Sequence, residues 1–263
     1  MTVKDPLWET ICAEAREVVS REPMMSGFFD RAILQHQSFQ QALCYNLSQQ
    51  LHSTVVAAEI VAEVIDQAMQ SDASICDAAR SDINACYDRD PACDTRFMPI
   101  LYFKGFQALQ LYRVAHWLWL QNRDVLALYF QSQMSEQFTV DIHPAAKLGC
   151  GIMIDHATGL VIGETAVVGD NVSILHSVTL GGSGCVRGSR HPKIGNGVMI
   201  STGAKILGNV TVGEGAKIGA GSLVLESVPA HVTVAGVPAK IVGAPKEPQP
   251  ALEMNQDLSD NSP

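Results

Sequence analysis

The chain has 263 residues, of which 47% are hydrophobic and 17% charged, a composition typical of a globular protein with one or two domains. Its net charge of −9 and pI of about 5.3 argue against a general affinity for nucleic acids or anionic membranes. The N-terminus is charged throughout and is not a secretory signal. The most apolar stretch, residues 108–120, is too short and too polar to cross a membrane, so we expect a cytoplasmic protein.

Residues 1–138 are predicted to form an all-helical domain. The first helix has a capping acid at Asp5, a proline in its first turn and a proline stop. The later segments carry apolar residues at three- and four-residue spacing, and the last of them is apolar on most faces and should be a long buried helix, against this chain or another subunit. The predicted helical segments are 5–23, 38–53, 54–70, 74–91 and 98–124.

Seven cysteines are present, an odd number without any CxxC pair, so neither a disulfide framework nor a thiolate zinc site is expected. Reduced thiols in a cytoplasmic protein are the simplest interpretation.

Residues 139–243 repeat with a period of six. Ten of the twelve steps between successive aliphatic anchors are six residues long, and glycine often follows the anchor. This period fits neither a helix nor a hairpin and predicts a parallel β-helix with three short strands per coil. The anchors are Ile142, Leu148, Ile154, Ile162, Val168, Ile174, Leu180, Ile194, Ile200, Ile206, Val212, Ile218 and Val224.

The predicted fold class is therefore α+β, an all-helical N-terminal domain followed by a parallel β-helix of hexapeptide repeats. Residues 244–263 are polar and rich in proline, and we expect them to form a flexible C-terminal tail.

The period fails at two places, and both contain histidine. The step from Ile154 to Ile162 is eight residues long and holds Asp155 and His156. The step from Leu180 to Ile194 is fourteen residues long and should extrude a loop with Arg187, Arg190, His191 and Lys193. Irregularities confined to such segments indicate sites mounted on a rigid stack.

The residues then show a family likeness. The segments VDIHPAAKLGCGIMIDHATG, RHPKIGNGVMI and AGVPAKIVG, with YDRDPAC and YFKGFQALQLYRVAHWLW in the helical half, closely resemble bacterial serine O-acetyltransferases over residues 5–245. The resemblance implies transfer of acetyl from acetyl-CoA to the hydroxyl of L-serine, the first step of cysteine biosynthesis from serine, with L-cysteine as feedback inhibitor. It also implies that the β-helix is left-handed. It further implies a homotrimer, paired into a hexamer by the helical domain of residues 1–138, which serves oligomerisation, with active sites between neighbouring prisms.

The same resemblance assigns roles to individual residues. His156 matches the general base, Asp141 the carboxylate that orients it, and His191 a catalytic or substrate-binding group. Arg190 should grip the serine carboxylate, since a guanidinium suits bidentate binding, and Asp90 and Asp155 should receive the amino group. Cofactor contacts are expected at Gly182, Thr202, Gly203, Lys217, Ala220 and Lys240. No metal is expected, and direct attack in a ternary complex needs no acyl-enzyme.

One departure concerns the last residue. Members of this family often end in isoleucine, which docks into O-acetylserine sulfhydrylase, whereas this chain ends in Pro263. The sequence therefore argues against that mode of docking.

Spacing alone leaves other interpretations open. Asp141 and Asp90 could be turn or helix-end acids, His156 a corner histidine and residues 189–192 a solvated basic loop. His176 follows Ile174 as His156 follows Ile154, so with His191 a three-histidine zinc site is a rival. Further rivals are an acetyltransferase for a sugar or antibiotic hydroxyl, a thiol mechanism through Cys150 or Cys185, and a non-catalytic assembly protein.

Overall fold

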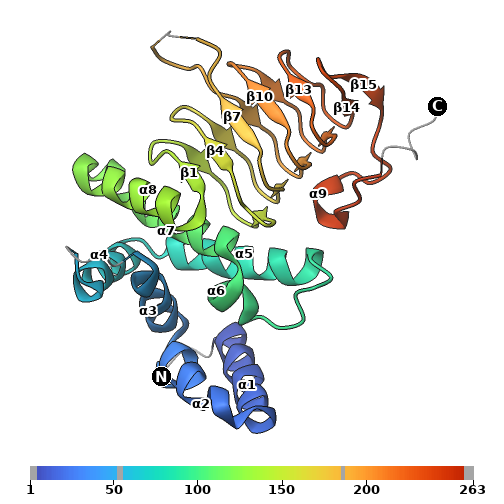
Figure 1. Cartoon of the computed structure of the whole chain (residues 1–263). Helices are drawn as coiled ribbons and strands as arrows, with labels where there is room; N and C mark the ends of the chain where they lie inside the picture. The colour runs from blue at the N-terminus through green and yellow to red at the C-terminus, as the bar shows by residue number, and fades with distance from the viewer. Residues whose placement is uncertain (1–4, 52–55, 185–186, 258–263) are drawn as a thin grey trace.

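The computed structural model describes residues 5–51, 56–184 and 187–257 and consists of a group of helices followed by a stack of short strands (Figure 1). The helical part contains α1 (Pro6–Arg21), the 3-10 turn η1 (Pro23–Met25), α2 (Ser26–Phe29), the π-turn η2 (Asp30–Leu34), α3 (Phe39–Leu51), α4 (Ala58–Ser71), α5 (Ser74–Arg89), α6 (Met98–Tyr102), α7 (Lys104–Leu120) and α8 (Asp124–Phe138).

The first helix forms as its sequence predicts. The side chain of Asp5 accepts a hydrogen bond from the Trp8 amide at 3.2 Å, Pro6 opens α1, and the helix ends at Arg21, two residues before Pro23. A cap of this kind satisfies one of the amides that the first turn leaves without an intrahelical partner.

The long buried helix predicted over 98–124 is wrong in one respect, because it is divided at Phe103. That residue adopts an extended conformation, with φ −95° and ψ 99°, and separates α6 from α7. The break lets α7 begin beside the β-helix, where Gly105 lies so close to the carbonyl of Ile154 that a Cβ would overlap it. Most residues of α7 are buried, as expected.

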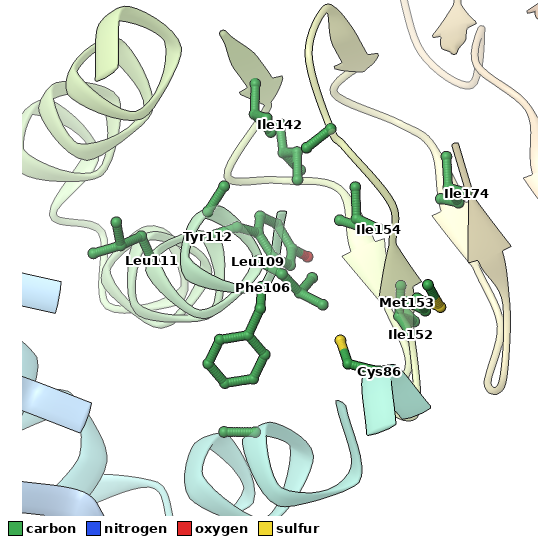
Figure 2. Close-up of a cluster of buried hydrophobic side chains, with 14 of the residues drawn as sticks. Cys86, Phe106, Leu109, Leu111, Tyr112, Ile142, Ile152, Met153, Ile154 and Ile174 are labelled. Atoms are coloured by element: carbon green, nitrogen blue, oxygen red, sulfur yellow. The ribbon is translucent and has the colours of Figure 1, made fainter. Parts of the chain in front are cut away.

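Helix α7 joins the two halves of the chain. Figure 2 shows Phe106, Leu109 and Tyr112 on α7 with Ile152 and Ile154 of the first coil in one apolar cluster. The hydroxyl of Tyr112 donates to the carbonyl of Ala146 at 2.5 Å. Burial of this apolar surface holds the helices against the end of the stack.

The strands form three parallel sheets that make the sides of a prism, a left-handed parallel β-helix. The five-stranded sheet contains β1 (Val140–Ile142), β4 (Leu160–Ile162), β7 (Thr179–Gly181), β10 (Lys205–Leu207) and β13 (Leu223–Val224). The four-stranded sheet contains β2 (Lys147–Leu148), β5 (Val167–Val168), β8 (Lys193–Ile194) and β11 (Thr211–Val212). The six-stranded sheet contains β3 (Met153–Ile154), β6 (Ser173–Ile174), β9 (Met199–Ile200), β12 (Lys217–Ile218), β14 (Thr233–Ala235) and, antiparallel at its end, β15 (Lys240–Gly243).

The predicted anchors stack on one another. Ile162 pairs in register with Ile142 on one side and Leu180 on the other, and the other two sheets repeat this pattern with their own anchors. All the anchors are buried except Leu148, which is half-buried. The six-residue period therefore predicted the register of the stack as well as its existence.

The longer irregular step leaves the prism as expected, whereas the shorter one forms a turn at its edge in which Ala157 is buried. The two extra residues before Ile162 form a tight turn in which His156 and Ala157 have positive φ. The longer insertion follows β7 and projects beyond the stack (Figure 1).

The C-terminal segment is more ordered than the flexible tail that we predicted. Residues Pro250–Glu253 form a short helix, α9, which contacts α5 and β9, and Ala251 is fully buried. The carbonyl of Ala251 accepts a hydrogen bond from Ser173 Oγ at 2.8 Å. The small side chain of Ala251 allows this close approach, which a composition-based prediction does not detect. Pro263 lies outside the described residues.

Candidate active site

The first irregular step forms an exposed turn at the edge between the six-stranded and the five-stranded sheets. The His156 side chain is 73% exposed, and its Nε2 lies 3.7 Å from Oδ2 of Asp155. Both His156 (φ 56°) and Ala157 (φ 60°) occupy the left-handed region, which is unusual for residues with a Cβ. A basic nitrogen is thus presented to solvent on a turn of unusual backbone.

Asp90 lies opposite this turn. Helix α5 ends at Arg89, and Asp90 caps it and lines the same cavity of about 370 Å³ as Asp155 and His156. Burial raises the pKa of the Asp155 carboxyl, and the negative charge of Asp90 adds to that rise while His156 opposes it. Two carboxylates that repel one another across a cavity form a site that a cation, such as an ammonium group, would stabilise.

The edge that carries His156 continues as a column along the stack. The Ser177 amide donates to the Thr158 carbonyl at 2.8 Å, the Gly203 amide to the His176 carbonyl at 3.0 Å and the Gly221 amide to the Thr202 carbonyl at 2.8 Å. We call the successive turns 155–159, 175–178, 201–204 and 219–222 the edge column. Of the predicted cofactor contacts, Thr202, Gly203 and Ala220 belong to it.

His176 is the neighbour of His156 in the edge column. The two ring centroids are 5.7 Å apart with an interplanar angle of 73°. Within the described part of the chain, the buried Nδ1 of His176 has no hydrogen-bond partner.

Arg190 and His191 lie at a different edge of the prism, between the five-stranded and the four-stranded sheets. The Arg190 amide donates to Oγ1 of Thr165 at 3.0 Å and the His191 amide to the same oxygen at 3.1 Å. Thr165 occupies the turn between β4 and β5. No hydrogen bond or ion pair joins this pair to Asp155 or His156 among the residues that the structure describes.

His191 is held as a neutral imidazole. The Thr165 amide donates to its Nδ1 at 3.1 Å, so Nδ1 accepts and the proton lies on Nε2. Burial lowers the pKa of His191, the charges of Arg190 and Lys193 lower it further, and Glu164 opposes them. Gly163 leaves space for the ring, because a Cβ there would overlap Cδ2 and Nε2.

Arg190 is already paired. Its Nη2 donates to Oε2 of Glu164, and this hydrogen bond lowers the pKa of Glu164. The side chains are 31% and 38% exposed. An incoming carboxylate would therefore exchange with, or share, a partner that the guanidinium holds at rest.

Asp141 does not contact His156. It is the middle residue of β1 and faces outward, and its Oδ1 accepts from Nε2 of Gln131 on α8 at 2.6 Å. In register it lies beside Val161, on a side of the prism rather than at the edge. Among the described side chains, the carboxylate within 4.0 Å of His156 is that of Asp155.

The remaining predicted cofactor contacts, Lys240, Gly182 and Lys217, differ in their surroundings. Lys240 is exposed on β15, and Gly182 lies beside Arg190 and His191. Lys217, predicted as a cofactor contact, is only 4% exposed, and its Nζ donates to the carbonyl of Asp257 at 2.6 Å. The C-terminal segment covers it, so in this structure its ammonium group is not open to a phosphate.

Within one chain, the three histidines of the rival zinc site do not come together. His191 lies at another edge from His156 and His176, and no group of three or more metal-binding side chains occurs in the described residues of the chain. Cys150 lines a different cavity, with Tyr112 and Asp170, and burial raises the pKa of its thiol, which disfavours a thiolate nucleophile. Cys185 lies outside the described residues.

None of the described helices is both long and apolar enough to span a bilayer.

Two residues beside the candidates were missed by sequence reasoning. Thr165 fixes the backbone and ring of His191, and Glu164 pairs with Arg190. The signal was present, because Thr165 precedes His191 by 26 residues, which is one 18-residue coil plus the eight extra residues of the loop.

Comparison with known proteins gives consistent matches in both halves of the chain. A family model described as "Serine acetyltransferase, N-terminal" matches residues 7–111, and one described as "Bacterial transferase hexapeptide (six repeats)" matches residues 191–226. A curated serine acetyltransferase of Salmonella typhimurium is 54% identical over 253 residues, covering 96% of this chain and 93% of its own. That of Haemophilus influenzae is 54% identical over 250 residues, covering 95% and 94%.

Solved structures agree. The serine acetyltransferase of Vibrio cholerae has a TM-score of 0.94 at 58% identity and covers 95% of this chain and 97% of its own. A coenzyme A complex from Brucella abortus has a TM-score of 0.90 at 51% identity, with 92% and 96% covered. A serine acetyltransferase in complex with cysteine has a TM-score of 0.93 at 53% identity, with 95% and 98% covered.

Proposed function

The chain belongs to the serine acetyltransferase family, and we propose that it performs its reaction by direct attack of the serine hydroxyl on acetyl-CoA, with His156 as the general base. The enzyme transfers the acetyl group of acetyl-CoA to L-serine and releases O-acetyl-L-serine and CoA. The observation that carries the proposal is the His156–Asp155 turn, which opens into the cavity that Asp90 also lines.

The amino group of serine is expected to bind between Asp90 and Asp155. An ammonium there relieves the repulsion that raises the pKa of Asp155. The serine hydroxyl then lies next to His156, which takes its proton as the oxygen attacks the thioester carbon. The tetrahedral intermediate collapses, the C–S bond breaks, and the CoA thiolate takes the proton back from the imidazolium.

Two carboxylates, Asp155 and Asp141, are candidates for stabilising the positive charge that His156 acquires in the reaction. Asp155 lies 3.7 Å from the ring, whereas Asp141 is bonded to Gln131. We assign the electrostatic support at rest to Asp155. Gln131 occupies only Oδ1 of Asp141, and a carboxylate can accept further hydrogen bonds, so this bond alone does not exclude an orienting role. Gln131→Leu should alter kcat if Asp141 acts in the cycle and leave kcat unchanged if it does not.

Arg190 and His191 complete the site from a neighbouring subunit in this proposal. They lie at a different edge of the prism from His156, so one chain cannot easily present all of them to one substrate. A closed threefold arrangement would place the His156 edge of one prism beside the His191 edge of the next. The buried neutral His191 would donate from Nε2 to the developing oxyanion, and Arg190 would bind the serine carboxylate.

Acetyl-CoA is expected to lie along the edge column, beside Thr202, Gly203 and Ala220, with Gly182 facing it from the neighbouring prism and Lys240 available to a phosphate. A related protein is solved with coenzyme A and another with serine, which supports both substrates. L-Cysteine has the same ammonium and carboxylate as serine and should compete at the same subsite, in line with the cysteine complex of a relative.

The test of the base is release of free thiol from acetyl-CoA in the presence of L-serine. His156→Ala should lower kcat by about 100-fold or more, the usual size of a general-base contribution. Serine-dependent turnover that survives this substitution would remove His156 from the mechanism. Turnover only with a sugar or another alcohol would instead overturn the roles given to Asp90, Asp155 and Arg190.

The test of the shared site is complementation between chains. His156→Ala and His191→Ala homo-oligomers should each be nearly inactive. If each site uses two adjacent subunits of a closed ring of three, each mixed trimer should recover one site of its three, which is about one quarter of all sites in a random equal co-assembly. No recovery in mixed oligomers of verified composition contradicts the arrangement. Mass measurement of the same samples distinguishes a trimer from a dimer of trimers.

A further inference from the structure

We propose that Lys104, the first residue of α7, is a positioning residue that holds the turn of the general base through the hydroxyl of Thr158. This inference rests on the role proposed for His156 and adds a contribution of the helical domain to the reaction itself.

The turn needs support from outside. His156 and Ala157 are consecutive residues with positive φ, a conformation that side chains with a Cβ disfavour. Such backbone persists only where surrounding contacts determine it. On the inner side these contacts are the burial of Ala157 and the bond from the Gly159 amide to the Thr139 carbonyl at 2.8 Å.

The outer side of the turn is held from the helical domain. Nζ of Lys104 donates to Oγ1 of Thr158 at 2.5 Å, and the Thr158 amide donates to the His156 carbonyl at 2.7 Å. The Thr158 hydroxyl in turn lies 3.4 Å from that same carbonyl and can donate to it. Lys104 is thus connected to the backbone of His156 through one residue.

The backbone at Lys104 is held in a fixed position beside the β-helix. Phe103 is extended and starts α7 at Lys104, and Gly105 packs against the carbonyl of Ile154, two residues before His156. The base of the Lys104 side chain is therefore fixed relative to strand β3. Because a small displacement of a catalytic group lowers the rate strongly, a fixed reference of this kind matters for kcat.

No ion pair accounts for the position of the Lys104 side chain among the residues that the structure describes. It lines the cavity that holds Asp90 and Asp155, yet within the described part of the chain it forms no ion pair within 4.0 Å, and its bond goes to a neutral hydroxyl. The competing explanation is that its charge binds the carboxylate of serine. The two explanations differ in what Thr158 contributes.

The experiment compares Lys104→Met, Thr158→Val, the double variant, Lys104→Arg and His156→Ala in steady-state kinetics. Lys104→Met and Thr158→Val should each lower kcat about tenfold, less than the ~100-fold of an ångström-scale misplacement, with KM for acetyl-CoA unchanged. The double variant should be no slower than either single one, because both remove one bond. Lys104→Arg keeps a donor and should restore most of kcat, and exposed Lys147→Met is the matched control.

Each other result has a definite meaning. A raised KM for serine in Lys104→Met, with kcat kept and Thr158→Val neutral, overturns the proposal in favour of substrate binding. If both substitutions are neutral while His156→Ala is inactive, the positioning role fails and the general base stands. If His156→Ala itself keeps its activity, the proposed mechanism fails first.

Discussion

The Asp82 carboxylate and the Arg113 guanidinium form a buried ion pair, with Oδ2 and Nη2 2.7 Å apart, where the helices meet the first coil. Asp82 also accepts from the Ile152 amide at 2.9 Å, and Arg113 also donates to the Gly149 carbonyl at 2.9 Å. Both partners of the pair, one on α5 and one on α7, are thus bonded to the β-helix backbone. The junction between the two parts of the enzyme is polar as well as apolar.

Removal of one partner should therefore destabilise the fold. Arg113→Met leaves the Asp82 carboxylate buried without a countercharge, which is expected to cost about 3–5 kcal/mol of unfolding free energy. Urea unfolding at neutral pH measures the change. Asp77→Asn on α5, the helix that carries Asp82, is the control, because that side chain is 77% exposed and should change stability by less than about 1 kcal/mol. Equal effects of the two substitutions would show that the buried pair is not special.

The raised pKa of Asp155 predicts the acid limb of the pH profile. Burial raises this pKa above its ordinary value of 3.8, and Asp90 raises it further. As pH falls, Asp155 is protonated early and binding of the serine ammonium is lost, so the Kd for serine, measured without acetyl-CoA, should rise with decreasing pH. Asp90→Asn removes a negative neighbour and should move the midpoint of this limb to lower pH.

The control for that shift is Asp88→Asn, an exposed acid on α5. It should leave the midpoint in place. Asp90→Asn should also weaken serine binding at every pH, so the midpoint of the pH dependence is the quantity to compare. A midpoint that stays in place in this variant contradicts the coupling between the two carboxylates.

Gly163 should be required because of the ring it faces. A Cβ at this position overlaps Cδ2 and Nε2 of His191, so Gly163→Ala forces the imidazole away from Thr165. We expect kcat to fall about 100-fold, the size of a misplaced catalytic group, with a smaller effect on thermal stability. Gly27→Ala meets nothing within 4 Å and is the control. Full activity of Gly163→Ala would argue against a role for His191.

The docking of α9 gives a stability prediction with a neighbour as control. Ala251 is fully buried and Leu252 is 41% exposed. Ala251→Asp buries a charge or detaches the segment and should cost about 1–3 kcal/mol, whereas Leu252→Asp should stay within about 0.5 kcal/mol. Urea unfolding distinguishes them, and similar costs for both would mean that α9 is not docked in solution.

The sequence predicted the β-helix in unusual detail because its anchors repeat in one dimension. Anchors six residues apart occupy equivalent places on successive sides of the prism, so every third anchor returns to the same side. The period alone therefore aligns Ile142 with Ile162 and Leu180. The two breaks in the period located Asp155, His156, Arg190 and His191 for the same reason. The extra residues of the longer break have no place in the prism and lie outside it, whereas those of the shorter break form a turn at its edge.

The rest could not be predicted from period. The division at Phe103 depends on where α7 meets Ile154, and the burial of Lys217 depends on a segment that begins some thirty residues later and returns along the stack. Asp141 failed to reach His156 because fifteen residues is less than one coil, so it lies on a side of the prism and not at its edge. Contacts between elements distant in sequence decide the first two, whereas the place of Asp141 follows from its spacing within the coil.

The returning C-terminal segment changes how the enzyme should come apart. A linear array of coils normally frays from its free end, since each coil depends only on its neighbours. Here the chain leaves the last coil at β15 and runs back past Gly197 to Ser173 and α5, so the free end is fastened to the part that folds against the helices. The last coil is therefore connected to the first coils through the C-terminal segment. Fraying of the last coil should also break the contacts of this segment with Ser173 and α5, so we expect the enzyme to unfold in one cooperative step.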